Sequence, residues 1–316
     1  MTKDARDWPA LTYAEWQDTC TTLHLWTQIA GKIRLSRTPW LNHSWHVTLY
    51  VTARGLTTSP IPDGSRSFDL LFDFVAHELR IQTSDAAVRT LPLRSQSVAD
   101  FYAQVRAALE ALGIQVLIHE TPNEIPDAVP FLADRAPRTY RREDAERFWH
   151  VLRRVDRLFK QFRSAFLGKS SPVHFFWGSF DHAVTRFSGR TAPLHPGGIP
   201  NLPDAVVHEA YSHEVSSAGF WPGGAGNDAL FYSYAYPEPK GYRDVKVRPP
   251  EAYFEPKLGE FVLPYASVRA AHDPDATLME FLQSTYEAAA TTGGWNRAAL
   301  ECDVGQAGVP RAISQR

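Results

Sequence analysis

One short stretch of the chain carries a carboxylate and an imidazole at a spacing that suits metal binding. Glu209 and His213 are four residues apart, so they would share one face of the helix that we expect over residues 205–217. Such a pair can chelate one divalent metal ion. The alternative is a hydrogen-bonded Glu–His pair without metal, because the stretch lacks the two histidines of the His-Glu-x-x-His motif.

A third ligand would come from the strand-like segment His174-Phe-Phe-Trp-Gly-Ser-Phe-Asp181. His174, Glu209 and His213 would form a set of two histidines and one carboxylate, which suits Fe(II) and is compatible with Zn(II). We therefore predict these residues as metal ligands, with Fe or Zn as the cofactor. In one continuous strand, His174 and Asp181 would point to opposite faces. The alternative for His174 is a hydrogen-bonded histidine packed among aromatic residues.

The other roles of an active site have candidates in the same part of the chain. Asp181 or Glu214 would transfer protons during the reaction. Arg186 or Arg190 would hold an anionic group of the substrate through guanidinium hydrogen bonds. The aromatic residues that we expect to line a substrate pocket are Trp177 and Trp221.

A second histidine cluster is the competing site. His24, His43 and His46 supply three imidazoles, a set that can bind zinc or copper. His43 and His46 would converge only if residues 42–43 lie in a turn, because residues three apart in a strand point to opposite faces. The interpretation that we favour is that these histidines hydrogen-bond to the backbone beside tryptophan residues.

The composition excludes several classes of protein. The 316 residues include 33 Lys and Arg against 35 Asp and Glu, so the net charge of −2 offers no basic field for nucleic acid or an anionic membrane. No apolar run is long enough to span a bilayer. The two cysteines are too few for a disulfide framework, which favours a reducing cytoplasm. Neither glycine-rich stretch forms a dinucleotide-binding or P-loop motif.

Helices and strands must position these residues. We expect an α+β fold with two halves, each a helix-flanked antiparallel sheet, and a cleft between them. The halves are residues 1–119 and 141–316, joined by a proline-containing linker over 120–140. Each half shows the order helix, Gly-Lys, strands, helix, which indicates an internal duplication unless the glycines are ordinary helix ends. The expected helices span 12–30, 97–112, 143–167, 205–217 and 275–292, and the expected strands span 45–52, 67–81, 88–93, 115–119, 173–187, 230–236 and 260–264.

Several motifs along the chain are specific enough to indicate a family. They include Leu23-His-Leu-Trp-Thr-Gln28, Ala53-Arg-Gly-Leu-Thr-Thr58, Ser171-Pro-Val-His-Phe-Phe-Trp-Gly-Ser-Phe-Asp181, Thr185-Arg-Phe-Ser-Gly-Arg190, Tyr211-Ser-His-Glu214, Ser217-Ala-Gly-Phe-Trp-Pro-Gly223 and Phe231-Tyr-Ser-Tyr-Ala-Tyr-Pro-Glu-Pro239. With these motifs the chain resembles the domain of unknown function 5996 family of bacterial proteins over nearly its whole length. The resemblance implies one full-length unit of that family and supplies no activity, cofactor or catalytic residue.

Two hypotheses of different classes follow from these residues. The first is a cytoplasmic metal-dependent enzyme that acts on a small organic substrate, anionic if the arginines bind it. Redox chemistry is favoured over hydrolysis because it suits a dry, aromatic pocket. The alternative is a non-catalytic protein that binds a small molecule in the aromatic cleft without metal. A role in protein interaction is a third option, and the sequence leaves the oligomeric state open.

Overall fold

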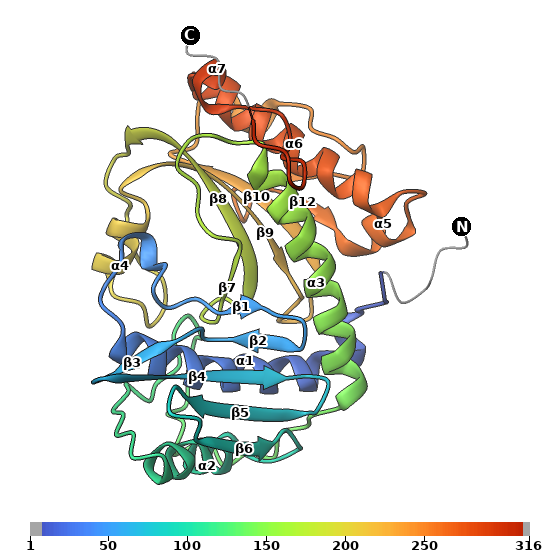
Figure 1. Ribbon diagram of the computed structural model, residues 1–316. Coiled ribbons are helices and arrows are strands. Elements are labelled where there is room, and N and C mark those ends of the chain that lie inside the picture. The colour runs from blue at the N-terminus through green and yellow to red at the C-terminus, as the bar shows by residue number, and fades with distance from the viewer. Residues whose placement is uncertain (1–7, 312–316) are drawn as a thin grey trace.

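The first half of the chain forms a six-stranded antiparallel sheet. In the computed structural model, which describes residues 8–311, its strands follow the order β1-β2-β4-β5-β6, and β3 pairs with β4 (Figure 1). The single strand expected over 67–81 is a hairpin, because Asp73 accepts two backbone N–H bonds that turn the chain. Residues 115–119, predicted as a strand, are irregular. The strands are β1 (Tyr50–Val51), β2 (Gly55–Thr57), β3 (Ile61–Asp63), β4 (Arg66–Asp73), β5 (Glu78–Thr83) and β6 (Val88–Pro92).

Two helices pack against this sheet and against each other. α2 (Val98–Ala111) begins after Ser97, whose side chain accepts a hydrogen bond from the N–H of Asp100 and caps the helix. α1 (Tyr13–Arg37) continues well past residue 30, where the sequence predicted its end. Its last two turns therefore reach the space between the two halves of the molecule.

The second half forms another six-stranded antiparallel sheet, in the order β11-β12-β10-β9-β8-β7. A backbone bridge between Leu49 and Phe175 connects it to the first half. The two sheets and their helices confirm the predicted α+β class. The predicted strand over 173–187 is divided into a hairpin, whereas β10 and β12 match their predicted bounds. The strands are β7 (His174–Phe176), β8 (Asp181–Thr191), β9 (His213–Trp221), β10 (Leu230–Tyr236), β11 (Tyr253–Glu255) and β12 (Glu260–Pro264).

Long helices cover one face of the second sheet. α3 (Arg142–Ser164) packs against β8, and α6 (Pro274–Thr292) packs against β9 and β10. Figure 1 shows α3 crossing this sheet and continuing to the first sheet, where it contacts β1 and α1. α3 buries an apolar face, which includes Phe148, Leu152 and Phe159. The opposite face of the second sheet is not covered by α3 or α6.

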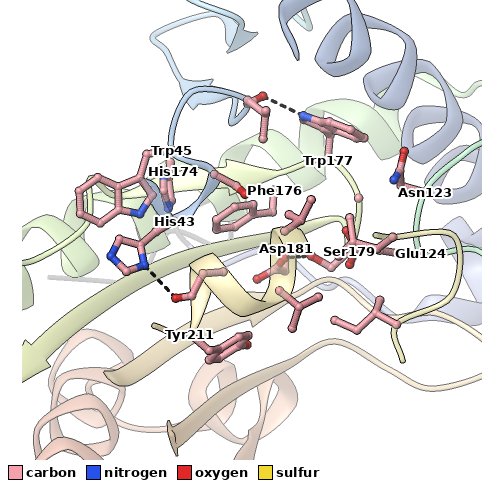
Figure 2. A pocket seen from close by; sticks show the side chains of 18 of the residues that line it. His43, Trp45, Asn123, Glu124, His174, Phe176, Trp177, Ser179, Asp181 and Tyr211 are labelled. Carbon is pink, nitrogen blue, oxygen red and sulfur yellow. Dashed lines mark hydrogen bonds between the residues drawn. The ribbon is translucent and has the colours of Figure 1, made fainter. Parts of the chain in front are cut away.

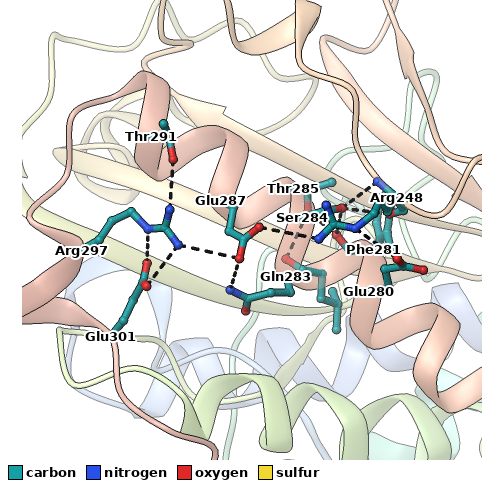
Figure 3. Close-up of polar contacts among 11 residues, drawn as sticks. Arg248, Glu280, Phe281, Gln283, Ser284, Thr285, Glu287, Thr291, Arg297 and Glu301 are labelled. Carbon is teal, nitrogen blue, oxygen red and sulfur yellow. Dashed lines mark hydrogen bonds and ion pairs between the residues drawn. The ribbon is translucent and has the colours of Figure 1, made fainter.

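Charged side chains on the outer side of α6 form a paired network (Figure 3). Arg248 lies 3.1 Å from Glu280 and 3.8 Å from Glu287. Arg297 lies 3.7 Å from Glu287 and 2.6 Å from Glu301. No helix within residues 8–311 combines the length and apolarity needed to cross a bilayer. The short helices are η1 (Asn42–Ser44), α4 (Asp204–Ala210), η2 (Tyr242–Asp244), α5 (Tyr265–Ala270) and α7 (Arg297–Leu300).

One similarity on which the proposed duplication rests, a Gly-Lys pair after the first helix of each half, is absent from the structure. The Gly-Lys pair at 31–32 lies inside α1, whereas the pair at 168–169 follows α3. Gly31 is a close-packing position, because a Cβ there would overlap the indole of Trp177. The expected linker over 120–140 is irregular yet packed, with Phe131 fully buried. The predicted domain bounds stay a prediction, and their outermost residues, 1–7 and 312–316, lie outside the described part of the chain.

Candidate functional site

A cavity of about 520 Å³ lies between the two halves of the molecule. The face of the second sheet opposite α3 and α6 forms its floor, and residues of α1, η1, α4 and the segment 119–124 form its walls (Figure 2). The volume is typical of small-molecule pockets. Its lining is mostly apolar. The aromatic residues of the lining include Trp45, Phe176, Trp177, Phe187, Tyr211 and Tyr232.

Asp181 reaches the floor because the chain reverses between β7 and β8. Residues 177–180 form a turn, with Phe180 in the left-handed region at φ 60°, and Phe176 pairs with Asp181 across the hairpin. Directly paired residues lie on one face of a sheet, and His174, Phe176 and Asp181 all line the cavity. The prediction that His174 and Asp181 face opposite ways is wrong, because it assumed one continuous strand.

The carboxylate of Asp181 is buried and accepts hydrogen bonds from the hydroxyl groups of Ser179 and Tyr232. Burial raises the pKa of Asp181 in spite of these bonds, because the charged form is poorly solvated. No lysine, arginine or histidine of the described chain forms an ion pair with it. Asp181 is therefore a buried carboxyl without an ion-pair partner in a mostly apolar cavity.

Glu124 brings a second carboxyl group to the same end of the cavity. Its backbone is left-handed (φ 61°), which is strained for a residue with a side chain. Its carboxyl packs against Gly178, where a Cβ would overlap the Oε1 atom. Burial and the charge of Asp181 raise the pKa of Glu124 to about 7. Figure 2 shows these two carboxyls at one end of the cavity, with His43 and Trp45 at the other.

Tyrosine hydroxyl groups surround the carboxyls. The hydroxyls of Tyr211 and Tyr234 form a 2.8 Å hydrogen bond. Burial raises the pKa of Tyr211 to about 12, and those of Tyr232 and Tyr234 above their usual range, so all three remain neutral. Close to them, Glu260 on β12 adds a third carboxyl, whose pKa burial and Asp181 raise to about 7. This end of the cavity therefore offers acceptors and neutral hydroxyls.

His174 is fully buried beside Phe176, with their rings 4.6 Å apart. Its Nδ1 has no hydrogen-bond partner among the residues that the structure describes. Burial lowers the pKa of His174 to about 3, so the imidazole is neutral at physiological pH. His174 thus leaves one buried ring nitrogen unsatisfied in a residue of the cavity wall, which is uncommon for a buried polar atom.

Lys32 is the only lysine or arginine in the cavity lining within residues 8–311. Its ammonium donates a hydrogen bond to the side chain of Asn123 and lies 5.8 Å from the centre of the Trp177 ring. Burial lowers the pKa of Lys32 to about 8. Trp177 donates its indole N–H to the carbonyl of Val47 at 2.7 Å. Trp177 is thus a predicted substrate-binding residue that does line the cavity.

The prediction of one helix over residues 205–217, on which the metal set depends, is wrong. The helix ends as α4 at Ala210, and His213 begins β9, so Glu209 and His213 do not share a helix face. Pairing of residues 213–221 with β8 and β10 outweighs the helical propensity of this stretch. Glu209 instead accepts the indole N–H of Trp40, which is half exposed. Within residues 8–311, no three or more His, Cys, Asp or Glu side chains are grouped to hold a metal ion.

The remaining predicted residues lie outside this cavity. Arg186 faces the helices on the other side of β8, with its guanidinium carbon 3.5 Å from the centre of the Phe162 ring, because residues alternate along a strand. Arg190 and Glu214 form an ion pair at 2.7 Å near the surface. Trp221 lines a second cavity of about 490 Å³. These four residues therefore do not join Asp181 in one site.

The competing histidine cluster makes separate contacts with the backbone. His43 lies in the 3₁₀ turn η1 and lines the cavity, with Nδ1 2.8 Å from a carbonyl oxygen of α4. His46 Nδ1 accepts the N–H of Leu41 at 3.2 Å. His24 Nε2 lies 2.8 Å from the carbonyl oxygen of Gly178. These contacts agree with the interpretation that the sequence favoured.

Several residues of the cavity were not predicted from the sequence. Glu124 lies in a stretch interpreted as a linker, and no period or motif marks it. Lys32 was assigned to a helix end, although it lies inside α1. Tyr232 and Tyr234 carry a usable signal, because residues two apart on a strand share a face. That spacing predicts a common surface but not that the surface borders a cavity.

A protein-family model matches nearly the whole chain. It is described as a family of unknown function (DUF5996), and the match covers residues 8–302. No curated protein and no solved structure matches the chain. The comparisons assign no activity, so a function has to be argued from the chemistry of the cavity.

Proposed function

The chain belongs to the DUF5996 family, whose description names no activity, and we propose from its cavity that the protein binds a small organic molecule between its two halves. The supporting observation is the cavity lining, which combines apolar walls with polar groups at fixed positions, notably Asp181, Tyr232 and His174. In ligand sites, apolar surface supplies affinity and a few polar groups fix the orientation. Binding without metal, the alternative that the sequence left open, therefore becomes the leading function.

The metal-dependent enzyme is the weaker candidate. Its ligand set was predicted from a helix that ends before His213, and residues 8–311 offer no other group of metal ligands. Asp181 keeps its predicted role as a proton-transfer candidate, because its carboxylate lines the cavity where a ligand would lie. Glu214 loses that role through its ion pair with Arg190.

A thermal-shift screen of small amines, alcohols, carboxylic acids and uncharged aromatic compounds tests the proposal. A compound that binds the folded protein raises its melting temperature. Tyr232→Phe removes the hydroxyl that donates to Asp181 in the cavity. Tyr242→Phe is the control, because it also removes a tyrosine hydroxyl from the second half of the chain, but one that donates to the carbonyl of Ser233 outside the cavity.

We expect several compounds to stabilise the wild-type protein and Tyr242→Phe alike, and to stabilise Tyr232→Phe less. A second variant, Ser217→Trp, fills the cavity from its floor and should abolish the shifts. The proposal fails if no compound shifts the melting temperature. It also fails if the shifts persist unchanged in a folded Ser217→Trp protein.

A further inference from the structure

We propose that the ligand of this cavity is an organic amine that carries a positive charge on an aromatic or branched apolar body. The inference rests on the proposed function and names its ligand class. Three independent features of the cavity point to this class: the charge balance at one end, the aromatic walls, and a buried histidine nitrogen without a partner.

The charge balance is the first feature. The carboxyls of Asp181 and Glu124 line the cavity, and Glu260 lies close by. None of the three has an ion-pair partner within the described chain, and the carboxyl of Glu124 accepts no hydrogen bond there either. A buried carboxylate without a counter-charge is costly, and folded proteins supply one wherever the charge is retained. An ammonium group placed between Asp181 and Glu124 would supply it.

The lysine and the histidines of the lining near this region form no ion pair with Asp181 or Glu124. Lys32, on α1, donates to Asn123. His43, on η1, bonds to α4 through Nδ1 and has Lys169 Nζ 3.1 Å from its Nε2. His119 is an exposed residue of the lining.

The sheet itself adds no opposing charge at the floor. His182 follows Asp181 in β8 but faces the helices, where its Nε2 lies 3.4 Å from Asp156. The three tyrosine hydroxyls around the carboxyls, described above, are neutral. The two carboxyls therefore have no ion-pair partner among the described groups around them.

The walls and the free histidine are the second and third features. Aromatic faces attract cations, and Trp177, Phe176 and Tyr211 surround the cavity. His174 lines the same cavity, and its buried Nδ1 has no hydrogen-bond partner within residues 8–311. Being neutral, its imidazole can accept an N–H of an amine without opposing its charge. The far end, around Trp45, is aromatic, so the ligand needs an apolar body opposite its ammonium group.

Calorimetric titration of the full chain with three probes of one shape tests the inference. The probes are 2-phenylethylamine, 2-phenylethanol and phenylacetate, a cation, a neutral molecule and an anion. At pH 8 we expect the amine to bind at least about tenfold more tightly than the alcohol, and phenylacetate most weakly. At pH 5.5 the preference for the amine should shrink, because Glu124 and Glu260, with pKa near 7, take up protons.

Two variants remove the charge and keep the shape of the carboxyls. Glu124→Gln and Asp181→Asn should each lower the affinity for 2-phenylethylamine by about tenfold and leave that for 2-phenylethanol nearly unchanged. Unchanged binding of the alcohol also shows that the variants are folded. Glu280→Gln, which removes a carboxylate on the outer side of α6, is the matched control and should change neither affinity.

The possible failures are distinguishable. The assignment of an amine as the ligand is wrong if the alcohol or phenylacetate binds as tightly as 2-phenylethylamine at pH 8. It is also wrong if the screen finds only neutral and acidic compounds, and in both cases the cavity still binds ligands. If no probe binds and the screen also finds nothing, the proposed function itself fails. An amine preference that survives in both Glu124→Gln and Asp181→Asn overturns the assignment to these carboxyls.

Discussion

Carboxyl groups have arginine partners in one region of this molecule and no ion-pair partner in another. On the outer side of α6, Glu280, Glu287 and Glu301 each have an arginine within 4 Å (Figure 3). At one end of the cavity (Figure 2), Asp181 and Glu124 form no ion pair within residues 8–311, and Lys32 of the lining donates to Asn123 instead. Exposed ion pairs add only about 0–1 kcal/mol each, whereas an unpaired buried charge is expensive. The chain thus leaves its most costly carboxyls unpaired, which is expected where a ligand supplies the partner.

The strongest way to break this contrast is to give the cavity a cation of its own. Phe176 is the direct cross-strand partner of Asp181 on the cavity face, so the ammonium of Phe176→Lys can reach that carboxylate. We expect the affinity for 2-phenylethylamine to fall by about 100-fold, or about 2.7 kcal/mol. Calorimetric titration at pH 8 measures the change.

Phe176→Met is the control for this substitution, because it has a similar length and no charge. It should lower the affinity for the amine by less than about tenfold, through lost aromatic contact alone. Equal losses in the lysine and methionine variants would show that charge at Asp181 does not determine binding.

The pH dependence of stability gives the next largest effect. Burial holds the pKa of Glu124 near 7, above its usual 4.5, so the folded protein binds the proton more tightly than the unfolded chain. The contribution of this group to stability is fully present below about pH 4.5 and is lost as the pH rises through 7. Glu124→Gln has no carboxyl to ionise, so it avoids this loss of stability. The substitution should therefore stabilise the ligand-free protein at pH 8 by about 1–3 kcal/mol.

Urea denaturation at pH 5.5 and pH 8 checks this expectation. The free energy of unfolding of Glu124→Gln should exceed that of the wild-type protein by more at pH 8 than at pH 5.5, because the wild-type carboxyl is mostly protonated at the lower pH. A variant that is less stable than wild type at pH 8 would mean that a described or bound cation already pairs with Glu124.

The smallest effect is expected at the outer side of α6. Glu280→Gln removes one exposed carboxylate from a 3.1 Å pair with Arg248 and should lower the free energy of unfolding by less than about 0.5 kcal/mol. The effect should have the opposite sign to that of Glu124→Gln and should disappear in high salt, because exposed pairs are screened. Denaturation in low and high salt measures both. A loss of about 2 kcal/mol would remove the contrast between the two regions.

The parts of the fold with a clear period were predictable. The apolar stripe of α3 and the alternation in β10 arise from local spacing, and burial on one face follows from that spacing alone. The stretch 205–217 has a comparable helical pattern, but sheet pairing converts its second part to β9. Tertiary contacts therefore determine the structure of this stretch. Because Glu209 and His213 do not share a helix face, the predicted metal set loses its geometric basis.

The candidate site was only partly predictable, for a different reason. Asp181 and Trp177, which the sequence singled out from one motif rich in aromatic and polar residues, do line the cavity, and their roles stay a prediction. Glu124 was not, since its importance comes from contact with Gly178 and from the charge of Asp181, both more than fifty residues away. Nothing in its local sequence, between prolines at 122 and 126, carries that information.

A crystal structure of the protein with 2-phenylethylamine at pH 8 is the most direct test of the account. We predict the amine nitrogen within about 2.7–3.2 Å of a carboxylate oxygen of Asp181 or Glu124, with the phenyl ring against the aromatic walls of the cavity. The account is contradicted if the amine is found only beside Glu280 or Glu287 on the outer side of α6 while the cavity remains without it.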